Sequence, residues 1–369
     1  MAKTAPVIAV IGGGYAGIAA IGGLAGRGRP PAELHLFDPS PGHQLMPELP
    51  SALDPGDDVA RHVLPFSQLL GTSPVQWHRV RVAQVNAAQH LLTDELGERH
   101  AFDWAVVAVG TTTFWPPVPG LAAHALPFRT AADAQAVKAK LQSRQRLVVG
   151  GGGLTGVELA GELAPRHHVA LVEAAPRLLP GLGLGLARYA AERLEYAGVR
   201  VMAGQRIREA TDQDVLLDGG GRIPYDTLIW AGGIAAPDAP QLPGIEHDAH
   251  GYPQADAWGQ VAPGVFVAGD LWIHRQPGGG IWPQTAQSAT ADGKFAAQTI
   301  WSRLERHQPG PPFEPANQGI LVSLDPRKGV GWVVDEGIPV WGFGARVMKD
   351  LVFKRYRQQV AHAFGRRRP

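Results

Sequence analysis

The 369-residue sequence contains no cysteine. This absence excludes disulfide bonds, thiolate metal ligands, iron–sulfur clusters bound by the chain and a redox-active dithiol. The histidines show no metal-ligand spacing such as HExxH, and no G-x-S-x-G motif is present. We therefore predict no metal site, no metal-dependent hydrolysis and no serine nucleophile. If the protein is a redox enzyme, its electrons must move through bound organic cofactors.

Net charge and long apolar runs are also nearly absent. A formal net charge of +1 indicates no nucleic-acid partner. The N-terminal apolar run loosely resembles a signal peptide, but five glycines between Gly12 and Gly22 favour a nucleotide-binding loop. No other segment reaches the roughly 18 uninterrupted apolar residues that a membrane-spanning helix needs. We expect a cytoplasmic protein, and leave open whether it lies on the inner face of the membrane.

Glycine, in contrast, is abundant, and two glycine-rich loops stand out. In the first, "VIAVIGGGYAGIAA" (7–20), a predicted strand Val7–Ile11 precedes Gly12-x-Gly14-x-x-Gly17 and a helix from about Tyr15 to Ala25. The next strand ends at Asp38. Such glycines let the backbone approach a pyrophosphate, the helix N-terminus attracts its charge, and the acid accepts hydrogen bonds from a ribose. The pattern predicts dinucleotide binding.

The second loop, "RLVVGGGGLTGVELAGEL" (146–163), repeats this order, with Gly151, Gly153 and Gly156 as its fingerprint glycines. The following strand ends at Glu173, whose charge favours a free ribose 2′-hydroxyl and hence NADH over NADPH. Arg177 is close enough in sequence to leave a 2′-phosphate open as the alternative. Two carboxylates lie on the helix after this loop. We expect Glu158 near a bound nicotinamide and Glu162 on the solvated face.

Three further strands end in glycine: "FDWAVVAVGTT" (102–112), "YDTLIWAGGIAA" (225–236) and "GVFVAGD" (264–270). Asp270 could hold the polyol of a flavin, with helix capping as the alternative. We predict an α/β protein with two Rossmann-like dinucleotide-binding domains, the second inserted in the first, plus a small C-terminal segment. The expected boundaries are 1–115 and 236–305 for the first domain, 116–235 for the inserted second domain and 306–369 for the C-terminal segment.

Taken together, these motifs resemble the two-dinucleotide-binding flavoproteins of the pyridine nucleotide-disulfide oxidoreductase fold. Within that superfamily, "IGGGYAG", "VVGGGGLTGVELAGEL", "DTLIWAGGI", "VFVAGD" and "PQTAQSATADGKFAA" are most similar to type II NADH dehydrogenases and to AIF-like quinone reductases of the ferroptosis-suppressor group. The disulfide-reducing branches and the sulfide:quinone reductases need cysteines, so this chain cannot share their mechanism.

The resemblance implies two cofactors, FAD and NADH, and assigns residues to them. The cofactor-binding residues are Gly12, Gly14, Tyr15, Ala16, Gly17, Asp38, Val82, Gly110, Gly269 and Asp270 for FAD, and Gly151, Gly153, Gly156, Glu173 and Gly232 for NADH. Glu158 and Gln287 are the expected catalytic residues. Trp282, Gln284 and Gln287 are candidates for the pocket of the electron acceptor, with helix packing as the competing role.

Two positions depart from the family pattern. Type II dehydrogenases commonly carry A-Q-x-x-x-Q at the quinone site, whereas here Ala286-Gln287 is followed by Thr290 and Ala291 where the second glutamine is expected. Leu271-Trp272 follows the Gly-Asp step, where the family often has a small residue or cysteine. Both departures concern the acceptor, and neither affects the flavin assignment.

The C-terminal tail is strongly basic. From Arg346 onward it holds eight lysines and arginines against one acid, Asp350. The apolar residues of the tail recur at intervals typical of an amphipathic helix at a membrane surface; they are Val347, Leu351, Val352, Tyr356, Val360 and Phe364. The alternatives are a helix docked on the body of the protein and an element of a homodimer.

The sequence therefore predicts an FAD-dependent NADH oxidoreductase that passes a hydride from NADH to FAD and then two electrons to a quinone or similar small acceptor. One alternative is an NADH-dependent reductase of a ferredoxin- or rubredoxin-type carrier, although only a short segment follows the second FAD-binding part. Another is a non-enzymatic, AIF-like protein whose partner choice responds to NADH.

Overall fold

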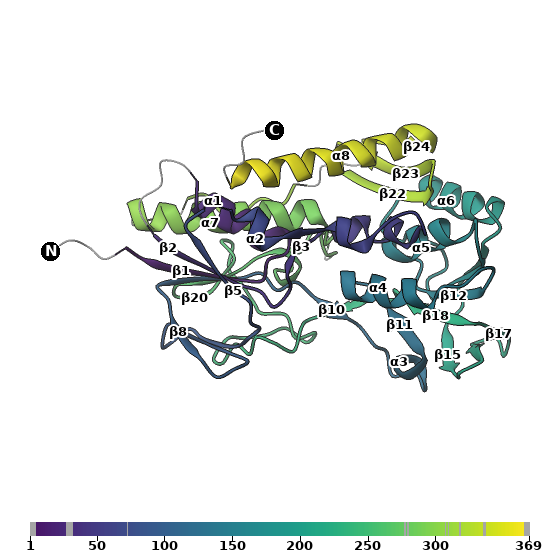
Figure 1. Cartoon of the computed structure of the whole chain (residues 1–369), viewed down its shortest axis with the longest axis horizontal. Helices are drawn as coiled ribbons and strands as arrows, with labels where there is room; N and C mark the ends of the chain where they lie inside the picture. The colour runs from purple at the N-terminus through teal and green to yellow at the C-terminus, as the bar shows by residue number, and fades with distance from the viewer. Residues whose placement is uncertain are drawn as a thin grey trace.

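The chain forms two lobes, each built around a parallel sheet (Figure 1). The computed structural model describes residues 5–26, 32–71, 73–276, 278, 280–306, 308, 310–316, 319–334 and 337–364. None of the helices within these ranges is long and apolar enough to cross a membrane.

The first sheet has six strands in the order β20-β21-β9-β1-β2-β5. All neighbouring pairs are parallel except β20 with β21. The central strand β1 is almost entirely apolar because it is covered on both faces, as parallel sheets require. The strands are β1 (Val7–Ile11), β2 (Glu33–Phe37), β5 (Val75–His78), β9 (Trp104–Val107), β20 (Gln260–Ala262) and β21 (Val265–Val267).

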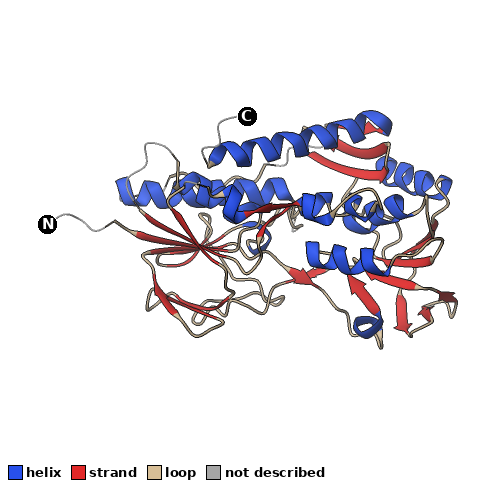
Figure 2. Ribbon diagram, in the orientation of Figure 1, coloured by secondary structure: helices blue, strands red, loops and turns tan. Residues whose placement is uncertain are grey.

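Helices α1 (Tyr15–Leu24) and α7 (Ala286–Arg306) cover one face of this sheet, and an antiparallel sheet of β6 (Val82–Asn86), β7 (Leu91–Asp94) and β8 (Arg99–Ala101) lies on the other side (Figure 2). The two helices approach closely because Gly293 of α7 faces α1. A Cβ at Gly293 would lie 1.9 Å from the carbonyl oxygen of Ala16.

Short elements fill the connections of the first lobe. The antiparallel pair β3–β4 lies beside helix α2, near the first glycine loop. These elements are β3 (Gly42–Gln44), η1 (Met46–Glu48), η2 (Ser51–Leu53), η3 (Val59–His62), β4 (Val63–Pro65), α2 (Phe66–Leu69) and η4 (Gly269–Leu271).

The second sheet has five strands, all parallel, in the order β11-β18-β12-β13-β14. Its strands are β11 (Ala125–Pro127), β12 (Arg146–Gly150), β13 (His168–Glu173), β14 (Arg200–Ala203) and β18 (Thr227–Trp230). Its helices are α3 (Leu121–His124), α4 (Ala131–Lys140), α5 (Leu154–Leu163) and α6 (Leu184–Tyr196). A small antiparallel sheet accompanies it, formed by β15 (Ile207–Ala210), β16 (Asp214–Leu217) and β17 (Arg222–Pro224).

Every strand of the second sheet lies in sequence between β9 and β21 of the first. Two short strands connect the lobes: β10 (Thr112–Thr113) leads out of the first lobe and β19 (Ile234–Ala235) leads back into it. The two strands pair antiparallel, so the two connections lie side by side. The predicted α/β fold with two Rossmann-like sheets is confirmed.

The C-terminal segment adds an antiparallel sheet, β22 (Gly319–Asp325), β23 (Lys328–Val333) and β24 (Ile338–Trp341), followed by the long helix α8 (Gly342–Ala363). Strand β22 packs on α5 of the second lobe, and α8 reaches back to α1 of the first (Figure 1). The predicted tail helix is therefore docked on the body. Tyr356, Val360 and Phe364 pack into the first lobe, whereas Val347, Leu351 and Val352 are exposed. The tail's Arg366, Arg367 and Arg368 lie outside the described residues.

Candidate functional site

A cavity of about 1380 Å³ runs between the two lobes. It extends from the first glycine loop to the start of α5, and α7 and α8 contribute further walls. Many residues singled out from the sequence line it: Gly12, Gly14, Tyr15, Ala16, Asp38, Val82, Gly110, Gly269, Asp270, Glu158, Gln284 and Gln287.

The first glycine loop joins β1 to α1, and its backbone explains Gly12 and Gly17. Gly12 has φ +98°, and a Cβ there would lie 2.5 Å from the carbonyl oxygen of Ala108. At Gly17, a Cβ would lie 1.7 Å from the carbonyl oxygen of Gly12, so only glycine lets α1 begin this close to the strand. A Cβ at Gly14 would meet nothing within 4 Å. The N-terminus of α1 thus adjoins open space in which an anionic group can bind.

Asp38 follows β2 and lies at the edge of the same loop. Its Oδ2 accepts a hydrogen bond from Gly13 N at 2.6 Å, and its Oδ1 accepts one from Ser40 N at 2.7 Å. Burial raises the pKa of Asp38, although these hydrogen bonds oppose the shift. The carboxylate is therefore fixed at the cavity wall.

Asp270 lies in η4 and also lines the cavity. The alternative role of helix capping does not apply, because α7 begins only at Ala286. Its Oδ2 is 3.4 Å from Arg129 Nη2, and burial raises the pKa of Asp270 while Arg129 opposes the shift. Gly269 N donates to the buried carboxylate of Asp292, and Gln284 Nε2 donates to the carbonyl oxygen of Asp270. The Gly-Asp step is therefore held from both sides.

Arg129 was missed by the sequence reasoning. Its Nε donates to the carbonyl oxygen of Thr111 at 2.7 Å, and both residues line the cavity. Thr130 and Asp133 form a capping box that starts α4 directly after Arg129. This T-x-x-D pattern was visible in the sequence, and it could have placed the arginine at the carboxyl end of a strand.

The second glycine loop, between β12 and α5, repeats the geometry of the first. Gly151 has φ +108°, and a Cβ at Gly156 would lie 1.7 Å from its carbonyl oxygen. Glu173 ends β13 and accepts hydrogen bonds from Gly152 N and Ala175 N. Several predicted residues are not part of the cavity lining: Gly17, Gly151, Gly153, Gly156, Glu173 and Gly232.

Glu158 lies on the second turn of α5 and contributes to the cavity wall. It is buried, and its Oε1 accepts hydrogen bonds from Lys349 Nζ of α8 and from Ser323 N of β22, the latter at 2.8 Å. The sequence offered no sign of these partners, because they lie more than 160 residues further along the chain.

The expectation that Glu162 is solvated is wrong. Its side chain is buried, with Oε1 3.5 Å from Arg346 Nη1. Burial raises the pKa of Glu162, while Arg346 opposes the shift. The cause is the C-terminal segment, since β22 and α8 cover the face of α5 that would otherwise meet water.

The acceptor candidates differ in position. Gln287 lines the cavity, and its buried Oε1 has no hydrogen-bond partner among the described residues; the same holds for Thr111 Oγ1. Buried polar atoms are rarely left unpaired, so both fit a site that a polar ligand completes. Trp282 is not part of the lining; its backbone N–H pairs with the carbonyl oxygen of His274 beside the Arg275–Ile281 bridge.

Helix α8 supplies a wall that the sequence reasoning did not assign. Lys349, Val352, Phe353 and Tyr356 line the cavity opposite the start of α7. The Tyr356 hydroxyl pairs with His43 Nε2 at 2.9 Å, and His43 Nδ1 pairs with the carbonyl oxygen of Gly13 at 3.0 Å. The helix is thereby connected to the first glycine loop.

Comparisons with known proteins agree with this geometry. Demethylphylloquinone reductase NdbB of Synechocystis is 28% identical over 378 residues, covering 96% of this chain and 92% of the relative. A type II NADH:quinone oxidoreductase of Staphylococcus saprophyticus is 25% identical and covers 96% of each chain. The structure of NDH2 from Plasmodium falciparum in complex with NADH superposes with a TM-score of 0.83 at 14% identity, covering 97% of this chain and 96% of that one.

The family model described as pyridine nucleotide-disulphide oxidoreductase matches residues 6–293, from the first glycine loop to the middle of α7. The chain belongs to the pyridine nucleotide-disulphide oxidoreductase family.

Proposed function

We propose that the protein is an FAD-dependent NADH oxidoreductase that reduces a quinone or a similar small acceptor. The observation that carries the proposal is the cavity of about 1380 Å³ between the lobes, which reaches both the first glycine loop and helix α5 of the second. Relatives named as a type II NADH:quinone oxidoreductase and as a demethylphylloquinone reductase support it over nearly the full length of the chain. When bound, FAD would supply the two-electron chemistry, which is hydride acceptance from NADH and electron transfer to the acceptor.

The residues of the first lobe fit FAD. Asp38 would accept hydrogen bonds from the adenosine ribose, and the α1 N-terminus would face the pyrophosphate. Asp270, held by Arg129 and Gln284, would bind the polyol. We assign residues 1–115 and 236–305 to this FAD-binding part, because β20, β21 and α7 complete the sheet and the helical layer begun by β1 and α1.

The second lobe, which we assign to residues 116–235, fits NADH better than NADPH. Glu173 places its negative charge where a 2′-phosphate would have to bind. Arg177, which could have received that phosphate, instead donates to the carbonyl oxygens of Leu182 and Pro180 at 2.6 and 2.8 Å. The guanidinium is thus already paired with the loop that follows β13.

The acceptor would enter between the start of α7 and helix α8. Gln287 offers an unpaired Oε1 on one side, and Val352, Phe353 and Tyr356 offer an apolar or aromatic wall on the other. Lys349, paired with Glu158, lies in the same wall and can hold the proton that a reduced acceptor needs. This pocket does not depend on the missing second glutamine of the A-Q-x-x-x-Q pattern.

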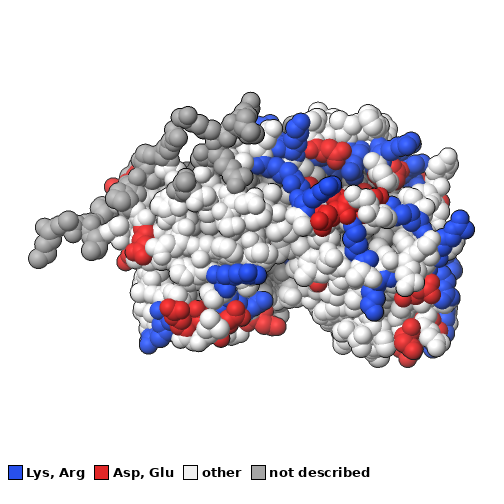
Figure 3. Space-filling model, in the orientation of Figure 1, with Lys and Arg blue, Asp and Glu red and all other residues white. Residues whose placement is uncertain are grey.

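We also propose that the protein contacts a membrane through β24 and the outer face of α8. Large apolar side chains are exposed there: Ile338, Trp341, Phe343, Val347 and Leu351. Figure 3 shows lysine and arginine side chains, with acidic side chains among them, over the half of the molecule that carries α8. A quinone dissolved in a lipid bilayer would then reach the cavity along this helix. A homodimer formed through the same face is the alternative outcome.

The decisive experiment is stopped-flow reduction of the purified holoprotein. We expect one FAD per chain, reduction by NADH at least tenfold more efficient than by NADPH, and rapid reoxidation by a soluble quinone. Ferredoxin and oxygen serve as the competing oxidants. A protein that can be neither purified with nor reconstituted with FAD overturns the proposal, as does slow quinone reoxidation with a long-lived reduced complex.

A further inference from the structure

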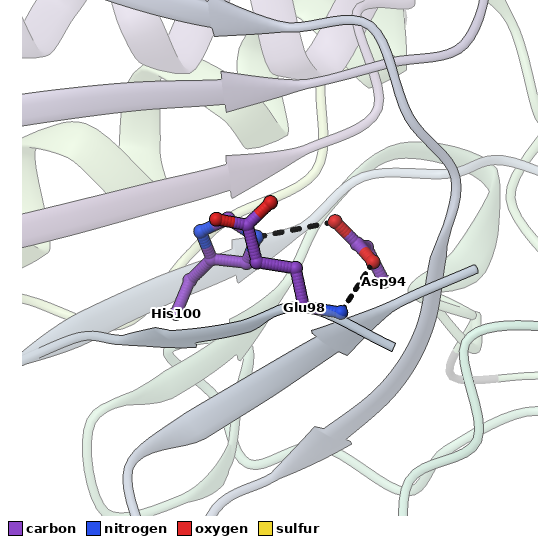
Figure 4. Close-up of side chains that lie close together, drawn as sticks. All are labelled: Asp94, Glu98 and His100. Carbon is purple, nitrogen blue, oxygen red and sulfur yellow. Dashed lines mark hydrogen bonds and ion pairs between the residues drawn. The ribbon is translucent and has the colours of Figure 1, made fainter. Parts of the chain in front are cut away.

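A cluster of metal-ligand side chains lies outside the cofactor cavity, in the antiparallel sheet β6–β8 of the first lobe. Asp94 ends β7, Glu98 lies in the turn, and His100 is on β8 (Figure 4). One ligand atom from each residue lies within 4.8 Å of the others. No other such trio of histidine, aspartate or glutamate side chains occurs among the described residues. The spacing D-x3-E-x-H belongs to a hairpin and differs from the helical HExxH spacing.

Asp94 holds its two carboxylate oxygens in different surroundings. It is almost fully buried, and its Oδ1 accepts hydrogen bonds from Leu96 N and Glu98 N, both at 2.9 Å. The other oxygen, Oδ2, forms a hydrogen bond with His100 Nε2 at 3.2 Å, and an ion bound between the two atoms would take the place of the shared proton. The backbone thus fixes one carboxylate oxygen and leaves the second directed at the imidazole, which is how ligand carboxylates are commonly held.

The spacing of these two atoms fits a tetrahedral ion. Ligands at about 2.0–2.2 Å from Zn²⁺ in tetrahedral geometry lie about 3.3–3.5 Å apart, and the observed separation of 3.2 Å is close to this edge. Figure 4 shows the Glu98 carboxylate beside the His100 ring. Glu98 is exposed, so its side chain can move onto an ion without disturbing the core.

The rings around His100 hold its imidazole in place, and the two carboxylates have no lysine or arginine partner among the described residues. The Phe37 ring packs edge-on against His100 with centroids 5.0 Å apart, and the His78 ring lies at 5.3 Å. Neither carboxylate forms an ion pair with any lysine or arginine that the structure describes; Asp94 pairs with His100. Two carboxylates and one imidazole are a donor set for a divalent transition-metal ion, with water completing the coordination.

We propose that Asp94, Glu98 and His100 bind a divalent transition-metal ion of the Zn²⁺ class. The ion would join the β7–β8 turn to the neighbouring strand on the outer surface of the first lobe. None of the three residues lines the cofactor cavity, so the site is independent of electron transfer. The proposal goes beyond the proposed function and does not rest on it.

Isothermal titration of the tag-free holoprotein with ZnCl₂, after dialysis against a chelator, tests the site. We expect one Zn²⁺ per chain with micromolar or tighter affinity, and at least tenfold weaker binding in each of three variants. Asp94→Asn keeps the oxygen that caps the turn but removes the charge. Glu98→Gln alters an exposed side chain, so its fold is not in question. His100→Gln removes the imidazole.

The matched control is His250→Gln, which removes an exposed histidine elsewhere in the first lobe and should bind like the wild type. Zn²⁺ should also raise the melting temperature of the wild type and the control but not that of Glu98→Gln. Absence of stoichiometric binding to the wild type overturns the proposal. So does wild-type affinity in Glu98→Gln and Asp94→Asn.

Discussion

At the scale of single residues, His43 shows how a buried side chain connects the flavin loop to the rest of the molecule. It is fully buried on β3, between the Gly13 carbonyl oxygen and the Tyr356 hydroxyl. A carbonyl only accepts, so Nδ1 carries the proton and Nε2 accepts from the tyrosine. Tyr15 packs against both rings. The arrangement is complete only while the imidazole is neutral.

This arrangement predicts acid sensitivity. Burial lowers the pKa of His43 from 6.5 to about 4, although the Gly13 hydrogen bond opposes the shift. The unfolded chain therefore takes up a proton first as the pH falls, so stability is complete above pH 6.5 and is lost between pH 6.5 and 4. Between pH 7 and 5, we expect this group alone to lower the free energy of unfolding by about 2 kcal/mol.

His43→Gln should remove that part of the pH dependence, because glutamine can donate and accept at similar positions without titrating. Urea unfolding midpoints at pH 7 and pH 5 measure it, with His124→Gln as the control at an exposed site. The other ionisable groups are common to the three proteins and cancel in the comparison. The same loss of stability at pH 5 in wild type and His43→Gln would contradict the assignment.

At the scale of elements, the contact between α5 and β22 determines the surroundings of the second glycine loop. A Cβ at Gly161 would lie 2.1 Å from the carbonyl oxygen of Leu324. Glycine therefore lets the strand lie directly on the helix. Ser323 N can then reach Glu158, and α8 follows with Lys349.

We predict that Gly161→Ala destabilises the protein, since the added methyl group must push β22 away from α5 at a cost of about 1–3 kcal/mol. The melting temperature should fall by several degrees. The control is Gly185→Ala on α6, where a Cβ would meet nothing within 4 Å. Alanine favours the helix there, so its melting temperature should stay equal or rise slightly. Equal losses in both variants would show that β22 does not depend on the close approach.

The elements also show what the sequence can and cannot predict. Both strand–loop–helix units follow from local patterns, and α1 and α5 begin at Tyr15 and Leu154, directly after their loops. These patterns need only neighbouring residues. The burial of Glu162 could not be predicted, because the covering elements β22 and α8 are distant in sequence and no local pattern shows that they pack on α5. The roles of Lys349 and Tyr356 in the cavity wall could not be predicted either, because their partners lie on elements that are distant in sequence.

At the scale of the whole molecule, α8 contacts both lobes and connects them (Figure 1). Near its start, Arg346 and Lys349 pair with Glu162 and Glu158 of the second lobe. Near its end, Arg357 Nη2 lies 2.7 Å from Glu48 Oε2 of the first lobe. These contacts occupy the inner face of the helix, so its outer face and β24 are free to meet a partner.

That outer face predicts binding to anionic lipid vesicles. Trp341 at the end of β24 and Phe343 at the start of α8 are 59% and 69% exposed, and Lys354 is exposed further along α8. Burying two large apolar side chains in the bilayer interface contributes about 1.5–3 kcal/mol each at full burial. Replacing both with serine should therefore weaken vesicle binding at least tenfold in a co-sedimentation assay.

The matched control replaces Leu96 and Ile281, which are 77% and 50% exposed elsewhere on the surface, with serine. This variant should sediment with vesicles like the wild type, because general surface apolarity is reduced to a similar extent while β24 and α8 are intact. Sedimentation velocity without lipid distinguishes membrane binding from the alternative, a homodimer formed through the same face. A dimeric wild type that becomes monomeric in Trp341→Ser/Phe343→Ser, with no vesicle binding by either, would assign this face to a second copy of the chain.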